Sequence, residues 1–380
     1  MTALLRRATA ACLLIVAGLL AGCASSGTPQ ASAPPAAAGT APLATSMTVV
    51  GRAWAVVAMG GSAAEHNQFW ELVTRPAASS QWELATPRGV ASNGGLVAAG
   101  RGGTLTIAFR PSQGLTFSPL ALTSDGGKTW GTGLIDSPVA AVPDALAAGG
   151  GTMLALLGDG AIDQSAAPGA RWRPLAAPGA LAASAAGRQC QVSGLTAVAL
   201  TASGAPLAGA SCARPGSAGI FARTASGWRA AGPAVPGGRP VRVLRLTGTV
   251  GGDTALLQAG AGATASLLAA WSSDGTRWSV SAPLSAGTGQ VLASGTGPGG
   301  AVWVLLPGGR AQTVSGPGAS WQALPPAPRG TAALAAGPDA GGFDALAVSG
   351  GKLTVYRLTP AGAWSKTQVI SAPIQYGSSG

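Results

Sequence analysis

Short apolar runs alternate with glycine-rich polar segments along most of the chain. The runs are rich in Val, Leu, Ile, Thr and Ala, and glycine, serine or proline stands at their ends. They occupy residues 49–58, 94–100, 104–109, 152–158, 196–200, 242–248, 253–260, 301–309, 344–351 and 352–358. This pattern predicts short β-strands joined by tight turns, and it does not show the period of long amphipathic helices.

A tryptophan that follows a turn rich in Gly or Ser recurs through the chain. The positions are Trp82, Trp130, Trp172, Trp228, Trp278, Trp321 and Trp364. The intervals between them are 48, 42, 56, 50, 43 and 43 residues, and propeller blades commonly take about 40 to 50. Three or four apolar runs per interval are enough for a four-stranded antiparallel sheet.

One such sheet cannot bury both of its faces, whereas sheets placed radially around an axis bury them against one another. The sequence therefore predicts an all-β fold, a seven-bladed β-propeller of four-stranded antiparallel blades. Six or eight blades are the alternatives, because the intervals are uneven. Alanine and glycine near the axis would let neighbouring blades approach closely.

The first 23 residues have the order of a secretory signal. Arg6 and Arg7 form a positive segment, an apolar segment of 8–20 follows, and Leu20-Ala21-Gly22-Cys23 closes it. The last four residues resemble the bacterial lipobox. The resemblance implies transfer of diacylglycerol to the Cys23 thiol, cleavage after Gly22 and acylation of the new amino terminus. An ordinary secretory signal with an incidental cysteine is the alternative.

The remaining chain then divides into two parts. Residues 23–45 are rich in Ala, Pro, Ser and Gly and carry no charge, which predicts a flexible tether after the signal peptide of 1–22. Residues 46–380 form the predicted propeller. The expected location is the cell membrane, with the lipid as anchor and the domain on the extracytoplasmic face.

Two of the turns before the tryptophans resemble the Asp-box, also called the BNR repeat, with the pattern Ser-x-Asp-x-Gly-x-Thr-Trp. The residues that carry the resemblance are Ser124, Asp125, Gly127, Thr129, Trp130, Ser272, Asp274, Gly275 and Trp278. Asp-Gly is a favoured hairpin turn, hydroxyls satisfy turn amides, and the Trp covers the turn. These residues are therefore expected to stabilise blades rather than to bind a ligand.

Composition and charge agree with a β fold. Gly contributes 60 and Pro 28 of 380 residues, and 9% are charged, against about a quarter in ordinary domains. Arginine supplies 20 of the 23 basic residues, and the net charge of +11 falls to +9 without Arg6 and Arg7. The arginines are spread singly along the sequence, so no nucleic-acid partner is expected.

Asp-box propellers include sialidases, so the sequence is compared with the residues that a sialidase needs. Phe109-Arg110-Pro111 resembles the Phe-Arg-Ile-Pro motif of sialidases with one residue missing. The tyrosines are Tyr356 and Tyr376, the glutamates are Glu65, Glu71 and Glu83, and beyond Ser165 the acids are Asp253, Asp274, Asp339 and Asp344. This inventory supplies no mid-chain Glu for a Tyr nucleophile and no convincing carboxylate pair. The alternative to a non-enzymatic protein is a sialidase-like glycoside hydrolase or a degenerate glycan-binding relative.

Other kinds of site are disfavoured as well. The single histidine, His66, excludes multi-histidine metal sites, and neither a Gly-x-Ser-x-Gly elbow followed by it nor a phosphate-binding Gly-Lys loop occurs. No cofactor and no metal are expected. Cys190 and Cys212, which remain after Cys12 and Cys23, are expected to form a disulfide in an exported domain, with two buried thiols as the alternative.

The sequence therefore predicts a lipid-anchored extracytoplasmic propeller that binds or scaffolds an unknown protein or glycan ligand. The ligand site stays unknown. The densest polar and aromatic cluster is residues 65–70, Glu-His-Asn-Gln-Phe-Trp, and Arg110 is the other unusual residue.

Overall fold

The chain divides into two units, residues 1–41 and 42–380. The computed structural model describes residues 44–49, 52–59, 69–77, 79–87, 95–99, 104–109, 119–134, 143–149, 151–167, 170–249, 251–287, 290–337 and 342–371, all in the second unit. The predicted signal peptide, Cys23, Arg110, Tyr376 and residues 65–68 therefore lie outside the described residues. No helix among the described residues combines the length and apolar character needed to cross a membrane.

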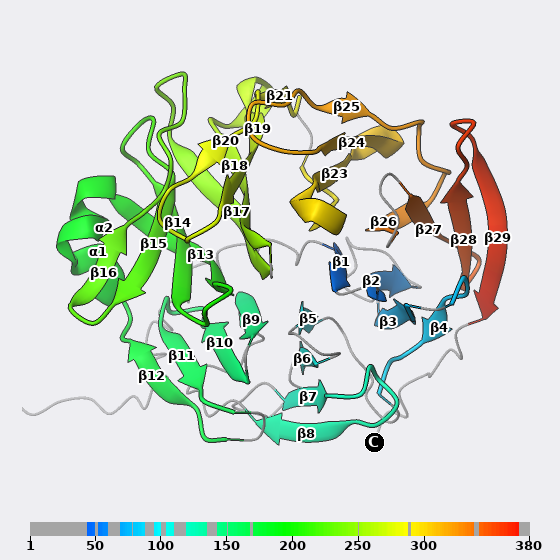
Figure 1. Ribbon diagram of the computed structural model, residues 1–380, viewed down its shortest axis with the longest axis horizontal. Helices are drawn as coiled ribbons and strands as arrows, with labels where there is room; N and C mark the ends of the chain where they lie inside the picture. Colours follow the sequence, from blue (N-terminus) through cyan, green and yellow to red (C-terminus); the bar gives the residue numbers. More distant parts are fainter. Residues whose placement is uncertain are drawn as a thin grey trace, which may run out of the picture. The chain divides into compact units, whose positions relative to one another are not determined.

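The described strands follow one another in antiparallel groups of four (Figure 1). The first groups are β1–β4 (Ala44–Val49, Arg52–Met59, Phe69–Arg75, Glu83–Leu84), β5–β8 (Gly95–Ala99, Leu105–Phe109, Pro119–Thr123, Gly131–Leu134) and β9–β12 (Ala145–Gly149, Thr152–Leu156, Ile162–Ser165, Arg173–Ala176). Two short helices, α1 (Ala180–Ala183) and α2 (Ala185–Cys190), connect β12 to the next group.

The later groups repeat the same plan. They are β13–β16 (Val192–Leu200, Pro206–Cys212, Gly219–Thr224, Gly227–Ala230), β17–β20 (Val241–Thr249, Gly252–Ala259, Ser266–Ser272, Ser279–Val280) with β21 (Leu284–Ser285), β22–β25 (Ala293–Thr296, Val302–Leu306, Arg310–Val314, Gln322–Ala323) and β26–β29 (Thr331–Ala336, Phe343–Ser349, Lys352–Leu358, Trp364–Ser371). Single 3₁₀ turns lie at Gly262–Thr264, Pro298–Gly300 and Pro307–Gly309.

These sheets form a β-propeller, as predicted. Within the unit 42–380 the first strand of each group lies toward the middle of the ring and the fourth toward its rim (Figure 1). Hydrogen bonds join β13–β16 to β17–β20 and β22–β25 to β1–β4, so these groups share larger sheets. The number of blades, seven in the sequence analysis, stays a prediction, although the described strands trace seven groups of four.

The tryptophans that mark the repeat stand at the start of the fourth strands. Trp82 precedes β4, Trp130 precedes β8 and Trp364 begins β29, for example. Each of the seven packs into a different apolar cluster of the described residues. Each cluster combines strands of two neighbouring groups, so these indoles stabilise the contact between sheets and not only the turn that precedes them.

Small residues allow the inner strands to approach closely. An added Cβ at Gly209 of β14 would lie 2.7 Å from Val243 Cγ1 of β17, and one at Gly295 of β22 would clash with the carbonyl of Ser46 in β1. Buried alanines of β2 and β26 share one cluster, among them Ala55 and Ala335. The Ala- and Gly-rich composition is therefore a packing requirement at these positions.

The first and last groups close the ring through β1. Ala44 and Thr45 of β1 pair with Ala293 and Ser294 of β22 in parallel. The Ser46 and Thr48 hydroxyls donate to main-chain carbonyls of β26, the second of these bonds being 2.8 Å long. β1 begins at Ala44, two residues before the boundary predicted for the domain.

Candidate functional site

The turn between β7 and β8 is built around the Asp125 carboxylate. It accepts hydrogen bonds from the main-chain N–H groups of Lys128 (3.0 Å) and Thr129 (3.1 Å) and from the hydroxyls of Thr123 (2.7 Å) and Thr129 (2.5 Å). These bonds hold the pKa of Asp125 far below its ordinary value. Gly127 takes a positive φ of 87°, and its carbonyl accepts from Trp130 Nε1 at 3.1 Å.

The hydroxyl that opens this turn belongs to Thr123 and not to Ser124, which the sequence analysis named. Thr123 Oγ1 accepts from Gly127 N at 2.9 Å, whereas the Ser124 side chain is exposed. The difference follows from the strand, because Thr123 is the last residue of β7 and its buried side chain points under the turn.

The turn after β19 is also built around a carboxylate that accepts hydrogen bonds from the turn, and it contains fewer residues. Asp274 Oδ1 accepts from Thr276 N and Arg277 N, both at 2.8 Å, and from Ser272 Oγ at 3.1 Å. Arg277 Nε pairs with Asp274 Oδ2 at 2.9 Å, and the pKa of Asp274 is lowered by these bonds. Gly275 takes a φ of 70°, and Trp278 packs against the cluster shared by β13–β16 and β17–β20.

A second carboxylate, Asp253, lies buried beneath that turn. It is the second residue of β18 and is 2% exposed. An added Cβ at Gly248 or at Gly275 would lie 3.2 Å from one of its carboxylate oxygens, so Asp253 is enclosed between the β17–β18 hairpin and the turn. Its Oδ1 has no hydrogen-bond partner among the described residues. Burial, and then the charge of Asp274, raise the pKa of Asp253 to about 7.

Asp253 and Asp274 thus titrate far apart, which is a property of acid–base pairs in enzymes. Their surroundings do not suit that chemistry. Asp253 is enclosed by main chain and apolar side chains, and the Asp274 oxygens are engaged by the turn. A general acid must reach the atom that it protonates, so we interpret this pair as part of the fold.

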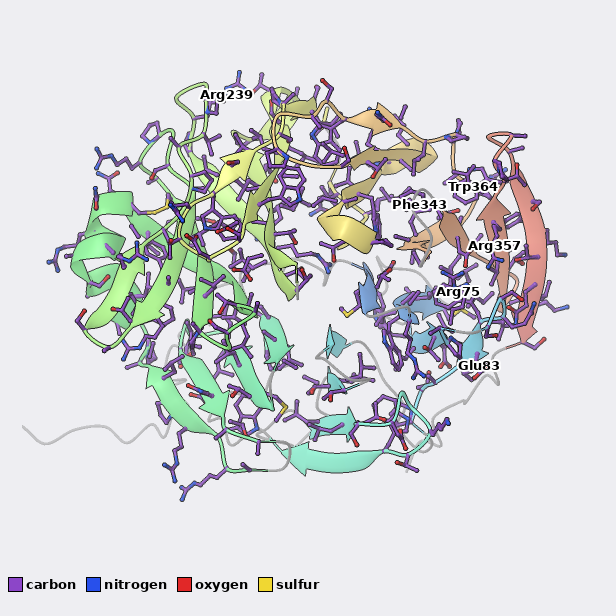
Figure 2. The ribbon with its side chains drawn as sticks, in the orientation of Figure 1. Arg75, Glu83, Arg239, Phe343, Arg357 and Trp364 are labelled. Atoms are coloured by element: carbon purple, nitrogen blue, oxygen red, sulfur yellow. A yellow bond between two sulfur atoms is a disulfide. The ribbon has the colours of Figure 1, made fainter. Side chains whose placement is uncertain are left out.

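A third carboxylate, Asp344, holds the first and last strand groups together. It is the second residue of β27 and is 1% exposed. Its oxygens accept from Trp82 Nε1 at 2.7 Å and from Arg357 Nε at 2.9 Å, and Arg75 Nε lies 3.4 Å away. Arg75 belongs to β3 and Arg357 to β28, and both are labelled in Figure 2. The Gln368 side-chain amide adds two bonds to the main chain of Trp82, at 2.7 and 2.8 Å.

Polar side chains also link the inner strands of the later groups. Arg245 Nε of β17 donates to Ser294 Oγ of β22 at 3.1 Å, and Thr196 Oγ1 of β13 donates to the Val243 carbonyl at 2.7 Å. Desolvation lowers the pKa of Arg245 to about 10, which leaves it charged at neutral pH. Thr196 lies at a β-bulge of β13, and β17 has a bulge beside Val243. A β-bulge bends its strand locally, and here the two bulges lie at the hydrogen bond between the strands.

The remaining predicted residues are distributed as follows. Cys190 and Cys212 form the expected disulfide, with a Cα–Cα distance of 5.3 Å, and it connects α2 to the end of β14. Of the cluster at 65–70, Trp70 packs half-buried beside two apolar clusters. The described residues contain no group of three or more His, Cys, Asp or Glu arranged to hold a metal ion.

Comparison with known proteins identifies the fold and no closer relationship. No family model and no curated protein matches the chain. The similar solved structures include YCF48 from Cyanidioschyzon merolae, with 14% identity over 84% of this chain and 96% of that chain and a TM-score of 0.50.

Two others carry the names of lactonases. The periplasmic gluconolactonase PpgL of Pseudomonas aeruginosa has 13% identity over 84% of this chain and 96% of that chain, with a TM-score of 0.54. A putative 6-phosphogluconolactonase of Bacteroides fragilis has 14% identity over 85% and 96%, with a TM-score of 0.52. At such identities the likeness supports the β-propeller fold alone.

Proposed function

We propose that this chain is a lipid-anchored extracytoplasmic β-propeller that binds or scaffolds a partner and does not catalyse a reaction. The observation that carries the proposal is the structural use of four of the described carboxylates. Asp125 and Asp274 organise turns, Asp344 joins two strand groups, and Asp253 is enclosed. Residues that serve the fold in this way are not available to a substrate, and the exposed loops remain as the surface for binding.

The two turns with the Asp-box resemblance support the same proposal. Their Asp carboxylates bond within their own turns, Gly127 and Gly275 take the positive φ that the turns need, and their Trp rings pack between neighbouring strand groups. We infer that they are structural repeats, and that the family resemblance extends to the blade edge without extending to sialidase chemistry.

A turnover screen tests the catalytic part of the proposal. The purified chain is assayed with fluorogenic glycosides and with gluconolactone, beside an Arg110→Ala variant. We expect no turnover above the buffer rate. Glycoside turnover that disappears in Arg110→Ala would support the sialidase-like alternative, and opening of the lactone would contradict a non-enzymatic role as well.

The anchor is tested by replacing Cys23 with alanine in the producing cell. We expect the wild-type chain to stay in the membrane fraction after a wash at about 1 M salt, which screens charge contacts, because acyl chains hold it. The Cys23→Ala chain should enter the medium or remain as an uncleaved precursor of higher mass. Cys12→Ala is the matched control and should behave as wild type. Unchanged fractionation and mass for Cys23→Ala would contradict the anchor.

A further inference from the structure

Five exposed cations of the later strand groups lie on one side of the ring, whereas the exposed Arg277 lies on the other side and pairs with Asp274. The set consists of Arg214, Arg239, Arg310, Arg329 and Lys352, all exposed, and we call it the basic face. Each residue lies at or near the end of a second strand or the start of a first strand. In antiparallel groups whose first strands run parallel, these positions share one side.

The parallel course of the first strands is observed directly. β1 pairs with β22 in parallel, and β14 pairs with β17 antiparallel, so that β13 and β17 run in the same direction. Ser46 and Thr48 of β1 contact the carbonyls of Leu334 and Ala336 in β26 in the same order.

A chain of hydrogen bonds connects the loops of the basic face. Gly216 N donates to the Arg239 carbonyl, and the Arg239 guanidinium donates to the Thr264 carbonyl. Arg310 Nη2 donates to the Ala286 carbonyl, and the Ala286 N–H donates to the Ala265 carbonyl. Bonds from Ala327 to Gly309 and from Val348 to Gly330 continue the chain to the loops of Arg329 and Lys352. These loops therefore lie side by side.

Acidic side chains of the same groups lie on the opposite side. Among the described residues from 170 to 371 the acids are Asp253, Asp274 and Asp344. Asp253 and Asp344 stand at the start of second strands, and Asp274 lies between a third and a fourth strand. In the earlier groups Asp144 and Asp159 lie on the side of the basic face, so the positive region is confined to the half of the ring formed by β13–β29.

The chain enters the propeller on this side, and an apolar side chain marks the place. Ala44 begins β1 and pairs with Ala293 at the start of β22. The preceding residue, Leu292, is 44% exposed, one of the few large apolar side chains at the described surface. Ala44 is 21 positions after Cys23, a reach of at most about 75 Å. A tether of this length would let a lipid on Cys23 enter a bilayer that contacts the basic face.

We propose that the basic face, with Leu292, docks on a bilayer that contains anionic phospholipid. The orientation rests on the proposed lipid anchor, whereas the affinity of the face for the bilayer does not. Guanidinium and ammonium groups attract the headgroup phosphates over about a Debye length, and an exposed leucine among them can enter the interface. Docking of this kind fixes the orientation of the propeller, with the turns of Asp125 and Asp274 directed away from the membrane.

Vesicle flotation tests the proposal with a chain that has no lipid. The mature chain from residue 23, carrying Cys23→Ala, is mixed with vesicles of phosphatidylcholine alone or with about one third phosphatidylglycerol. We expect binding to the anionic vesicles only, and its loss at about 0.5 M salt. Because Cys23 is absent as a lipid site, failure here leaves the anchor test unaffected, and failure of the anchor test leaves this result unaffected.

Matched double variants identify the face. Arg239→Gln with Arg310→Gln, or Arg329→Gln with Lys352→Gln, should each weaken binding to the anionic vesicles about 25-fold, since one cation near the surface contributes about a fivefold factor. Arg171→Gln with Arg173→Gln removes two exposed cations at the start of β12 on the opposite side, and it should change binding less than about threefold.

Three results would overturn the proposal. They are equal binding to neutral vesicles, an equal loss in the Arg171 and Arg173 control, and binding of a soluble polyanion such as polyglutamate without binding of vesicles. Melting temperatures of all variants are measured beside wild type, and a double variant that melts early is replaced by the other pair.

Discussion

Replacing Asp344 with asparagine is expected to lower the free energy of unfolding by about 3–5 kcal/mol. The carboxylate is buried and accepts from Trp82 Nε1 and Arg357, with Arg75 beside it. An amide of the same size presents an NH₂ group to these donors and removes the negative charge that faces two guanidinium groups. Breaking one side of a buried ion pair is costly because the partners stay desolvated.

The position of Asp344 in the ring adds a consequence for dynamics. Trp82 and Arg75 belong to the first strand group, whereas Asp344 and Arg357 belong to the last. Asp344→Asn removes contacts between these two strand groups, and local opening is easiest where contacts are fewest. Amide hydrogen exchange in the variant should therefore rise first in β1–β4 and β26–β29. Chemical denaturation followed by tryptophan fluorescence measures the stability.

Asp159→Asn is the matched control for this prediction. Asp159 is exposed in the turn between β10 and β11 and accepts one main-chain bond, from Ala161 N at 2.9 Å. Its replacement should cost less than about 1 kcal/mol. An Asp344→Asn chain as stable as Asp159→Asn would show that the contacts of the Asp344 carboxylate contribute nothing measurable to holding the two strand groups together.

The strand pattern and the repeat could be predicted from the sequence, because both depend on residues that are close together in the chain. A tryptophan after a turn indicated the start of a fourth strand at each of the seven positions, and the apolar runs correspond to strands. The Asp-Gly turns were also recognisable from neighbouring residues. The turn hydroxyl belongs to Thr123, two residues before Asp125, just as Ser272 stands two residues before Asp274. The spacing of the Ser-x-Asp pattern already pointed to this position, and Ser124 was chosen only because it is a serine.

The long-range polar contacts could not be predicted in the same way. Asp344 appears in the sequence as an isolated acid in an apolar run, a signal of a buried charge that needs partners. Trp82 is 262 residues away, and nothing in the local pattern selects it. The basic face was missed for a related reason. Its cations are widely spaced along the chain, and only the alternation of strand direction brings them to one side.

Asp253 stands at the same place in its strand as Asp344, and the opposite result is expected there. Asp253→Asn should stabilise the protein at pH 8 by about 2 kcal/mol and at pH 5 by less than about 1 kcal/mol. Asp344 faces two guanidinium groups, whereas Asp253 faces the carboxylate of Asp274. Burial and that negative charge raise its pKa to about 7, from an ordinary value of 3.8.

The sign of the pH dependence follows from proton binding. Between about pH 4 and pH 7 the folded state keeps a proton on Asp253 that the unfolded state has released, so stability falls as the pH rises through this range. At 1.36 kcal/mol per pH unit the full difference would be about 4 kcal/mol. Screening by water at the exposed turn beside it reduces this to about 2 kcal/mol.

Denaturation curves at pH 5 and pH 8 measure this effect directly. Asparagine cannot ionise, so the variant loses the full penalty that wild type carries at pH 8 and only the smaller part that is already present at pH 5, where the unfolded chain has released its proton. Asp344→Asn is the control, because it should be destabilised at both pH values. If Asp253→Asn unfolds more easily than wild type at pH 8, the charged carboxylate stabilises the fold and the prediction is wrong. Asp253 would then need a cationic or hydrogen-bonding partner. Its enclosed position between β17, β18 and the Asp274 turn does not supply one.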